Sequence, residues 1–495
     1  MQARRSGAEP EHQQLQDLAD LYAAGRLELL VTKARALLRQ FPKDVVTYNI
    51  LGAALVRLEK IDEAVGVYRE IIKLHPTYAE AHNNLGVALG RLYDFEGAAA
   101  SYHEALRVQP HYIDAAVNLG HALQRLGRLD EALASCQHAV NLGPAIAVAH
   151  NYMGGVLRDL GRPTEAAASY RRALALDPAS AENHADLGSA LLDMGKLAEA
   201  AACYRDALRR DPGFADAHHR LGDVLADLGE FKDAALHYGK AAHRESCAKM
   251  LSCFFAAGRH EDYATALGDL ARSDPTNIRA ATISASVTQQ TGAANIYPFC
   301  AAPLRFVAIH NIADQIAPIE IFDADVVAEL RGPKFVFEPP GKTTKGGHQT
   351  SGNLFELGGT RINALQNIIR TQIAAYVAAH ASADDLFIRR WPRAYHLNGW
   401  YVNLRQGGHQ QMHIHPSGWL SGVLYLRVPT QLDGDEGAIR FTITGEDDRG
   451  PERELLHRPR AGDLVLFPSS LLHHTIPFAA DEERHSLSFD LCPKE

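Results

Sequence analysis

A period of 34 residues runs through the first half of this chain and constrains its fold more than any other feature. Four columns keep this register over six periods: a glycine, an alanine, an aromatic residue or cysteine, and a proline. Their first members are Gly52, Ala64, Tyr68 and Pro42. A repeat of this length predicts one supersecondary unit per period, stacked on its neighbours to bury a shared core. We expect two closely packed helices per unit, with the proline ending the second helix.

The repeat columns resemble the tetratricopeptide repeat, and the resemblance covers about residues 45–248. Degenerate versions of the unit precede and follow this range, as expected of a solenoid that must close the two ends of its core. The sequence therefore predicts four parts. They are an N-terminal cap with a degenerate repeat at 1–44, six repeats at 45–248, a degenerate helical repeat and linker at 249–295, and another domain at 296–495.

The first helix of each unit is expected to line the inner groove of the array. Two residues before the glycine column, Asn84 and Asn118 lie in an NLG pattern that resembles the asparagine ladder of O-GlcNAc transferase. That resemblance implies that Asn84 and Asn118 bind a protein or peptide substrate by its backbone. The other four repeats carry different residues at this position, so solvated polar residues on a helix surface remain the alternative.

Composition excludes several classes of partner. The net charge is -9 and the basic residues form no stripe, which argues against nucleic acid. No apolar run approaches the ~18 residues of a membrane span, and the first residues lack the apolar stretch of a secretory signal. The six cysteines follow no disulfide or zinc spacing. We expect a cytoplasmic protein without a membrane partner, and the sequence leaves its oligomeric state open.

Beyond about residue 290 the helical repeat gives way to short strands. Alternating segments such as HLNGWYVNLRQ, WLSGVLYLRVP, GAIRFTI and RHSLSFDL are separated by glycine-rich turn signals. One amphipathic helix is expected at about 360–381. The whole chain is therefore predicted to be an all-α tetratricopeptide solenoid followed by a mainly-β jelly roll, or double-stranded β-helix, with one supporting helix.

The expected jelly roll contains a pattern typical of a metal centre. His413 and His415 are two residues apart, so an extended backbone would place both imidazoles on one face. His473 offers a third imidazole after the strand DLVLFP. On the last strand, Arg484 and Ser486 also share a face and could receive a small carboxylate. A metal beside an acid socket favours non-heme Fe(II) oxygenation.

The order H-x-H, apolar strand, GDLVLFPSSLLHHTIP and R-x-S resembles Fe(II)/2-oxoglutarate oxygenases of the prolyl-hydroxylase-like and aspartyl/asparaginyl β-hydroxylase kinds. The resemblance implies Fe(II), 2-oxoglutarate as cosubstrate and O2. It implies that His413 and His473 are iron ligands and that Arg484, helped by Ser486, binds the far carboxylate of 2-oxoglutarate. Most members read H-x-D, so His415 is either a third ligand or a residue that lines the pocket.

Other residues near the motif are weaker candidates. Tyr401, Asn403 and Ser421 are expected on flanking strands with polar tips in the cofactor pocket, and the spacing of Tyr401 to His413 matches the aspartyl hydroxylases. Trp419 either walls the substrate site or belongs to the core. No catalytic side chain is expected beyond the metal site.

The leading prediction is a 2-oxoglutarate-dependent dioxygenase that hydroxylates a protein or peptide recruited by the repeats. Two alternatives remain open. Gly407 to His415 also fits the G-x5-H-x-H half of a cupin motif, which predicts a metalloenzyme that does not use 2-oxoglutarate. The histidine at position 415 is equally compatible with a repeat scaffold whose oxygenase domain is inactive.

Overall fold

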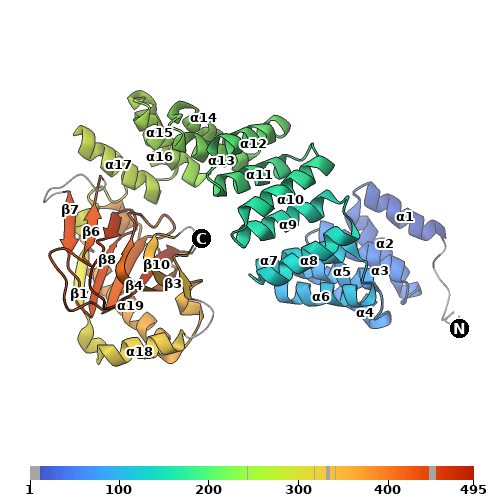
Figure 1. Cartoon of the computed structure of the whole chain (residues 1–495). Helices are drawn as coiled ribbons and strands as arrows, with labels where there is room; N and C mark the ends of the chain where they lie inside the picture. Colours follow the sequence, from blue (N-terminus) through green and yellow to red (C-terminus); the bar gives the residue numbers. More distant parts are fainter. Residues whose placement is uncertain are drawn as a thin grey trace. The chain divides into compact units, whose positions relative to one another are not determined.

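The computed structural model describes residue 10 and residues 12–241, 243–316, 318–330, 335–339, 342–444 and 453–494 (Figure 1). The chain divides into two compact units, residues 1–228 and 229–495. The predicted domain limits at 44, 248 and 295 stay predictions. Among the described residues, no helix is both long and apolar enough to span a membrane.

The first unit consists of helical hairpins, as the repeat predicts (Figure 1). Its inner helices begin 34 residues apart from α3 onward, at Val45, Ala79, Ile113, Ala147 and Ala181. The helices are α1 His12–Ala23, α2 Leu27–Gln40, α3 Val45–Arg57, α4 Ile61–Leu74, α5 Ala79–Arg91, α6 Phe95–Val108, α7 Ile113–Arg125, α8 Leu129–Leu142, α9 Ala147–Asp159, α10 Pro163–Leu176, α11 Ala181–Asp193, α12 Leu197–Arg210 and α13 Ala215–Asp227.

The glycine column is required by the close approach of the two helices in each hairpin. A Cβ atom at Gly86 in α5 would lie 2.6 Å from the Tyr102 ring of α6, and one at Gly154 in α9 would lie 2.7 Å from the Tyr170 ring of α10. Both tyrosines are buried. The aromatic column therefore fills the space that the glycines leave, which is the packing expected from the repeat, and the predicted tetratricopeptide solenoid is confirmed.

We predict that Gly86→Ala destabilises the first unit by about 1–3 kcal/mol, because the new methyl group must displace a buried ring. Gly66→Ala in α4 is the matched control, since a Cβ there meets nothing within 4 Å. Alanine at this open helical site should raise stability by up to about 1 kcal/mol. Urea unfolding followed by circular dichroism measures both changes, and equal effects of the two substitutions would contradict the packing argument.

The second unit begins with four helices and continues as a β domain. The helices are α14 Phe231–Ala241, α15 Arg244–Ala256, α16 His260–Ser273 and α17 Ile278–Thr291, followed later by α18 Ile319–Glu329, α19 Thr360–Ala379 and the short α20 Leu386–Arg389. The strands are β1 Ala308–Asn311, β2 Phe335–Phe337, β3 Thr344–Thr350, β4 Tyr395–Gln410, β5 Leu420–Arg427, β6 Ile439–Thr442, β7 Glu454–His457, β8 Asp463–Pro468, β9 Leu472–Thr475 and β10 Arg484–Pro493.

The strands form two antiparallel sheets, and the predicted jelly roll is confirmed. A seven-stranded sheet has the order β1-β8-β5-β10-β4-β3-β2, and a three-stranded sheet has the order β7-β6-β9. The expected helix at 360–381 is α19. The glycine-rich stretch that precedes α19 also forms a strand, β3, which pairs with β4.

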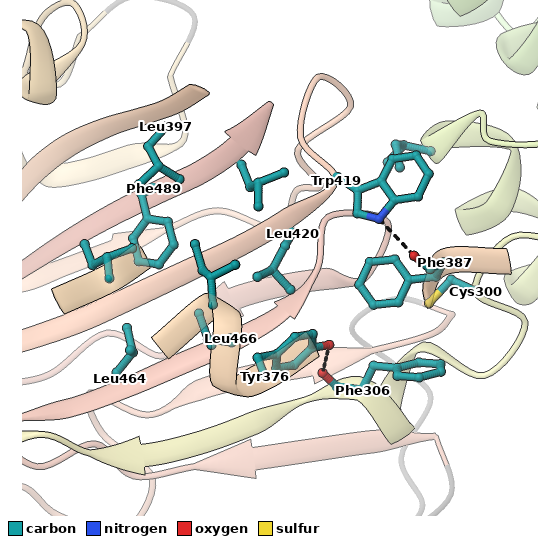
Figure 2. Packing of buried hydrophobic residues seen from close by; sticks show 14 of the residues in the cluster. Cys300, Phe306, Tyr376, Phe387, Leu397, Trp419, Leu420, Leu464, Leu466 and Phe489 are labelled. Atoms are coloured by element: carbon teal, nitrogen blue, oxygen red, sulfur yellow. Dashed lines mark hydrogen bonds between the residues drawn. The ribbon is translucent and has the colours of Figure 1, made fainter. Parts of the chain in front are cut away.

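Each central strand of the larger sheet separates its residues between two faces. The helix face carries leucines and phenylalanines that pack with α19 and the aromatic cluster of Tyr376, Phe387 and Trp419, and Figure 2 shows Leu420, Leu464, Leu466 and Phe489 in this layer. The opposite, inner face carries Val423, Tyr425, Val465 and Phe467, which pack with Ile439 and Phe441 of the smaller sheet. A functional residue must therefore lie on the inner face to reach the space between the sheets.

Candidate metal centre

Backbone hydrogen bonds bring the two histidine segments together. The His413 N–H donates to the His473 carbonyl at 3.0 Å, and the His473 N–H donates to the His413 carbonyl at 3.1 Å. The His415 N–H donates to the Ser469 carbonyl at 3.0 Å. These bonds pair the chain before β5 with the chain from the end of β8 to β9, so residues far apart in sequence present their side chains to one point.

The three imidazoles of His413, His415 and His473 converge, as the sequence predicts for a metal centre. One nitrogen of each lies within 4.8 Å of the others, and the Nε2 atoms of His415 and His473 are 3.2 Å apart. Each Nδ1 faces an acceptor. The acceptors are the Gln411 carbonyl at 2.6 Å for His413, the Leu471 carbonyl at 3.0 Å for His473, and Asp490 at 3.0 Å for His415.

This pattern defines the donor set. If each Nδ1 carries the proton that its acceptor requires, each Nε2 is left with a lone pair. Three lone pairs that face one another repel unless a cation lies between them, and outer acceptors of this kind orient metal-bound histidines in proteins. Imidazole nitrogens suit iron, zinc and copper. The three imidazoles therefore fit a transition-metal ion. The fold brings all three predicted ligands, His413, His415 and His473, together.

Burial favours the neutral form of the His413 and His473 imidazoles, which is the form that binds metal. Burial, with His415 beside it, lowers the pKa of His413 from 6.5 to about 4. Burial and the neighbouring His413 and His415 rings hold the pKa of His473 well below its ordinary value. Both imidazoles therefore remain neutral, and able to bind metal, at pH values where exposed histidines are charged.

These pKa shifts predict a pH-dependent stability of the metal-free protein. Between pH 6.5 and about 4 the unfolded chain protonates His413 while the folded chain does not, so stability should fall as the pH is lowered. The slope is at most about 1.4 kcal/mol per pH unit for each such group. Thermal unfolding in chelator should show a smaller loss for His413→Gln than for the wild type. Identical pH profiles of the two proteins would contradict the assignment.

Arg484 is a buried cation whose countercharge is not found among the described residues. It is 1% exposed, its Nη1 donates to the Gly437 carbonyl at 2.8 Å, and its guanidinium lies 5.2 Å from the centre of the Tyr425 ring. Its Nε has no hydrogen-bond partner. Burial lowers the pKa of Arg484. A buried guanidinium with a free N–H group is the arrangement expected of a site that receives an anion.

Tyr425 lies between Arg484 and the cavity that the histidines line. Its buried hydroxyl also lacks a hydrogen-bond partner, and burial raises its pKa to about 12, so it is a neutral donor. Tyr425 lines the same inner cavity as all three histidines, together with Val423, Phe467 and other residues of both sheets. Tyr425 thus borders the cavity that the imidazoles line, and the Arg484 guanidinium lies beside the Tyr425 ring.

Ser486 and Ser421 lie on the inner face of the larger sheet. Ser486 follows Arg484 by two residues on β10 and is opposite Tyr425 of β5 in the sheet. Ser421 lines the cavity, donates to Asp490 Oδ1 at 2.7 Å and lies 2.8 Å from Ser469 Oγ. A direct contact of either serine with a cosubstrate stays a prediction.

The structure does not bring Tyr401, Asn403 or Trp419 to the cavity. On β4, Trp400 lines the inner cavity, so its neighbour Tyr401 and Asn403 lie on the other face. There Tyr401 Oη donates to Asp323 at 2.7 Å and Asn403 Nδ2 donates to Glu483 at 3.0 Å. Trp419 donates to the Phe387 carbonyl within the helix-face core (Figure 2). Their predicted contacts with cofactor or substrate are corrected, because strand alternation and core packing direct them elsewhere.

Asn84 and Asn118 lie in clefts of the first unit. Asn84 lines a cleft of about 430 Å³ with Tyr22, Asn49 and other residues of α1, α3 and α5. Asn118 lines another of about 520 Å³, and its Nδ2 donates to Asn83 Oδ1 at 3.1 Å. Both amides are therefore accessible from a cleft, and their predicted contact with a peptide stays a prediction.

Several residues of the site were not singled out from the sequence. Besides Tyr425, they are Asp490, which contacts His415, and Trp400, whose ring stacks on the His415 ring at 5.5 Å between centroids. Trp400 also borders a cleft of about 680 Å³ that opens beside His413 and His415. Alternation along β10 would have indicated Asp490, since Arg484, Ser486, Ser488 and Asp490 form one polar face.

Sequence comparison identifies both parts of the chain. Residues 398–490 match the family described as "Putative 2OG-Fe(II) oxygenase". Residues 52–92, 79–109, 112–179, 157–205 and 185–246 match tetratricopeptide-repeat families. No curated protein sequence matches the chain.

Two solved structures similar to parts of this chain are titled as TPR proteins. TTC0263 of Thermus thermophilus is 28% identical, with 36% of this chain and 96% of that chain covered and a TM-score of 0.32. YrrB, titled a TPR protein with an unusual peptide-binding site, is 25% identical, with 35% and 90% covered and a TM-score of 0.30. The family matches thus fall into two groups, tetratricopeptide-repeat families within residues 52–246 and the family described as "Putative 2OG-Fe(II) oxygenase" at residues 398–490.

Proposed function

We propose that this protein is an Fe(II)- and 2-oxoglutarate-dependent hydroxylase that acts on a protein or peptide side chain recruited by the tetratricopeptide groove. The supporting observation is that one nitrogen from each of three imidazoles lies within 4.8 Å of the others in a cavity lined by Tyr425. The Tyr425 hydroxyl and the Nε of the neighbouring Arg484 lack hydrogen-bond partners. The match of residues 398–490 to the oxygenase family supports the same reaction class.

In this proposal the chain's own residues have three roles. His413, His415 and His473 hold the iron through their Nε2 atoms, and Arg484 with the Tyr425 hydroxyl holds the far carboxylate of 2-oxoglutarate. The apolar walls, Val423 and Phe467 among them, exclude water from the reacting centre. When bound, Fe(II), 2-oxoglutarate and O2 supply the oxidative decarboxylation that inserts one oxygen atom into a C–H bond.

The cleft of about 680 Å³ is the proposed entrance for the substrate side chain. It borders His413 and His415 and continues past Trp400, Asn398 and Gln410 to the β3 segment. Its lining is rich in amide and hydroxyl groups, which match the hydrogen-bonding groups of a polypeptide. Asn84 and Asn118 of the first unit would bind another part of the same polypeptide.

The direct test is succinate formation. Protein purified without oxygen is supplied with Fe(II) and 2-oxoglutarate and then exposed to O2, and we expect oxygen-dependent conversion of 2-oxoglutarate to succinate and carbon dioxide. Oxygen consumption without succinate would favour the cupin-type reaction. Binding of a partner without metal binding or turnover would favour the inactive scaffold.

Recruitment by the repeats is tested separately. The double substitution Asn84→Ala and Asn118→Ala should leave succinate formation without a protein substrate unchanged, because both residues belong to the first unit. It should reduce the addition of one oxygen atom to a protein substrate, measured by mass spectrometry. Unchanged modification would exclude these two asparagines from recruitment.

A further inference from the structure

Asp490, near the end of β10, is a buried carboxylate at the edge of the metal centre. It is 7% exposed, and its two oxygens lie 2.9 and 3.0 Å from His415 Nδ1. We infer that Asp490 positions His415 as the third metal ligand and thereby supplies, one residue removed from the metal, the carboxylate that this site lacks at position 415. The inference rests on the proposed metal site and identifies a positioning residue within it.

The three histidines differ in what holds their Nδ1 atoms. Those of His413 and His473 face neutral backbone carbonyls, whereas that of His415 faces a charged side chain. A hydrogen bond to a carboxylate is about twice as strong as one between neutral groups. It also draws the Nδ1 proton away from the ring and makes Nε2 a better electron donor. His415 is thus the ligand that receives negative charge from the protein.

Asp490 is itself held in place. Ser421 Oγ donates to Asp490 Oδ1 at 2.7 Å and lies 2.8 Å from Ser469 Oγ. Gly418 leaves room for this network, because a Cβ there would lie 2.6 Å from Ser469 Oγ and 3.3 Å from Asp490 Cβ. The carboxylate is therefore held by Ser421 as well as by His415, as a residue that orients a ligand must be.

The His415 ring is constrained in its remaining directions by stacking. Trp400 lies on it with 5.5 Å between ring centroids and 18° between planes, and His473 lies on it at 5.0 Å and 11°. Stacking fixes the plane of the ring but leaves two orientations related by a flip, which exchanges Nδ1 with Cδ2 and Nε2 with Cε1. The bond to Asp490 selects the orientation in which Nε2 lies 3.2 Å from His473 Nε2.

A second pair of the same kind provides the control. His457 Nε2 and Asp463 Oδ2 lie 3.0 Å apart in the same unit, and Asp463 is also buried, but neither residue belongs to the histidine cluster. Removing the charge from Asp463 tests what a buried aspartate–histidine pair contributes to folding alone. Removing it from Asp490 tests that contribution together with the effect on His415.

The experiment titrates full-length, metal-free protein with Co(II), whose visible absorption reports its ligands. Asp490→Ala should weaken Co(II) binding roughly 10- to 100-fold and change the absorption spectrum, and Asp490→Asn should do so less, because an amide oxygen can still accept the Nδ1 proton. In the His415→Ala background, Asp490→Ala should weaken binding no further. Asp463→Asn should leave the affinity unchanged. If Asp490→Ala weakened Co(II) binding equally in the wild type and in the His415→Ala background, the inference would be overturned.

A second readout needs no metal. In metal-free protein, nitrogen NMR should show His415 protonated at Nδ1 in the wild type and with mixed tautomers in Asp490→Ala. An unchanged tautomer in Asp490→Ala, in protein whose thermal unfolding shows it folded, would overturn the inference even if the protein turned over 2-oxoglutarate. Conversely, failure of the wild type to bind Co(II) would reject the proposed function while the NMR result still decided the role of Asp490.

Discussion

Replacing His473 with alanine should abolish oxygen-dependent succinate formation. His473 is 4% exposed and central in the cluster, because its backbone pairs with His413 and its Nε2 lies 3.2 Å from that of His415. Without it, the two remaining imidazoles must bind the ion alone, and turnover should fall to the background of free Fe(II). Succinate released after O2 is admitted is the quantity to measure.

His474→Ala is the matched control for this substitution. His474 is the next residue of β9 and lies outside the histidine cluster. It should retain most of the activity, and His413→Ala should behave like His473→Ala. Near-normal turnover by His473→Ala, or equal losses in the His473 and His474 variants, would contradict the metal assignment.

Replacing Arg484 with methionine should weaken 2-oxoglutarate binding by roughly 100-fold or more, since removing one partner of a buried ion pair costs about 3–5 kcal/mol. Calorimetric titration of the metal-loaded, oxygen-free protein measures this affinity. Arg484→Lys keeps the charge but not the planar fork, so it should give an intermediate loss. A second titration uses succinate, a dicarboxylate without the 2-oxo group. It tests whether binding of a carboxylate alone also depends on Arg484.

Arg484→Met also distinguishes two roles for this arginine, binding of an anion and stabilisation of the fold. Among described residues, no carboxylate is paired with Arg484, and its Nε lacks a partner, so a methionine of similar length should not lower the thermal stability of the ligand-free protein. A structural arginine would show the opposite pattern, with reduced stability and unchanged 2-oxoglutarate affinity. That outcome would remove Arg484 from the proposed cosubstrate site.

The helical part of the fold could be predicted because its signal is repeated. The glycine and aromatic columns agree over successive periods, and the contact of Gly86 with Tyr102 gives the physical reason for both. Strands β4, β5, β8 and β10 alternate or are strongly apolar and were also predictable. Strand β3 was not, because its glycines and polar residues follow a turn composition, and its extended form depends on pairing with β4.

The candidate metal centre likewise contains residues that the sequence indicates and residues that it does not. The spacing of His413 and His415 indicated a shared face, and backbone pairing with the His473 segment completes the cluster. The interpretation of Tyr401 was wrong because spacing along a strand does not identify its face. Only the position of Trp400 on the inner face decides that Tyr401 lies opposite. The alternation of polar residues along β10 indicates that Asp490 shares a face with Arg484. It does not indicate the contact with His415, which lies 75 residues away in sequence and is brought close only by the fold.

We propose that three imidazole nitrogens, from His413, His415 and His473, hold one Fe(II) ion. X-ray absorption at the iron edge of the anaerobic protein, loaded with one equivalent of Fe(II), reports these ligands. We expect an iron environment with three imidazole ligands that loses one imidazole in His415→Ala. Iron that shows no imidazole scattering, or the same scattering in the wild type and in His473→Ala, would contradict it.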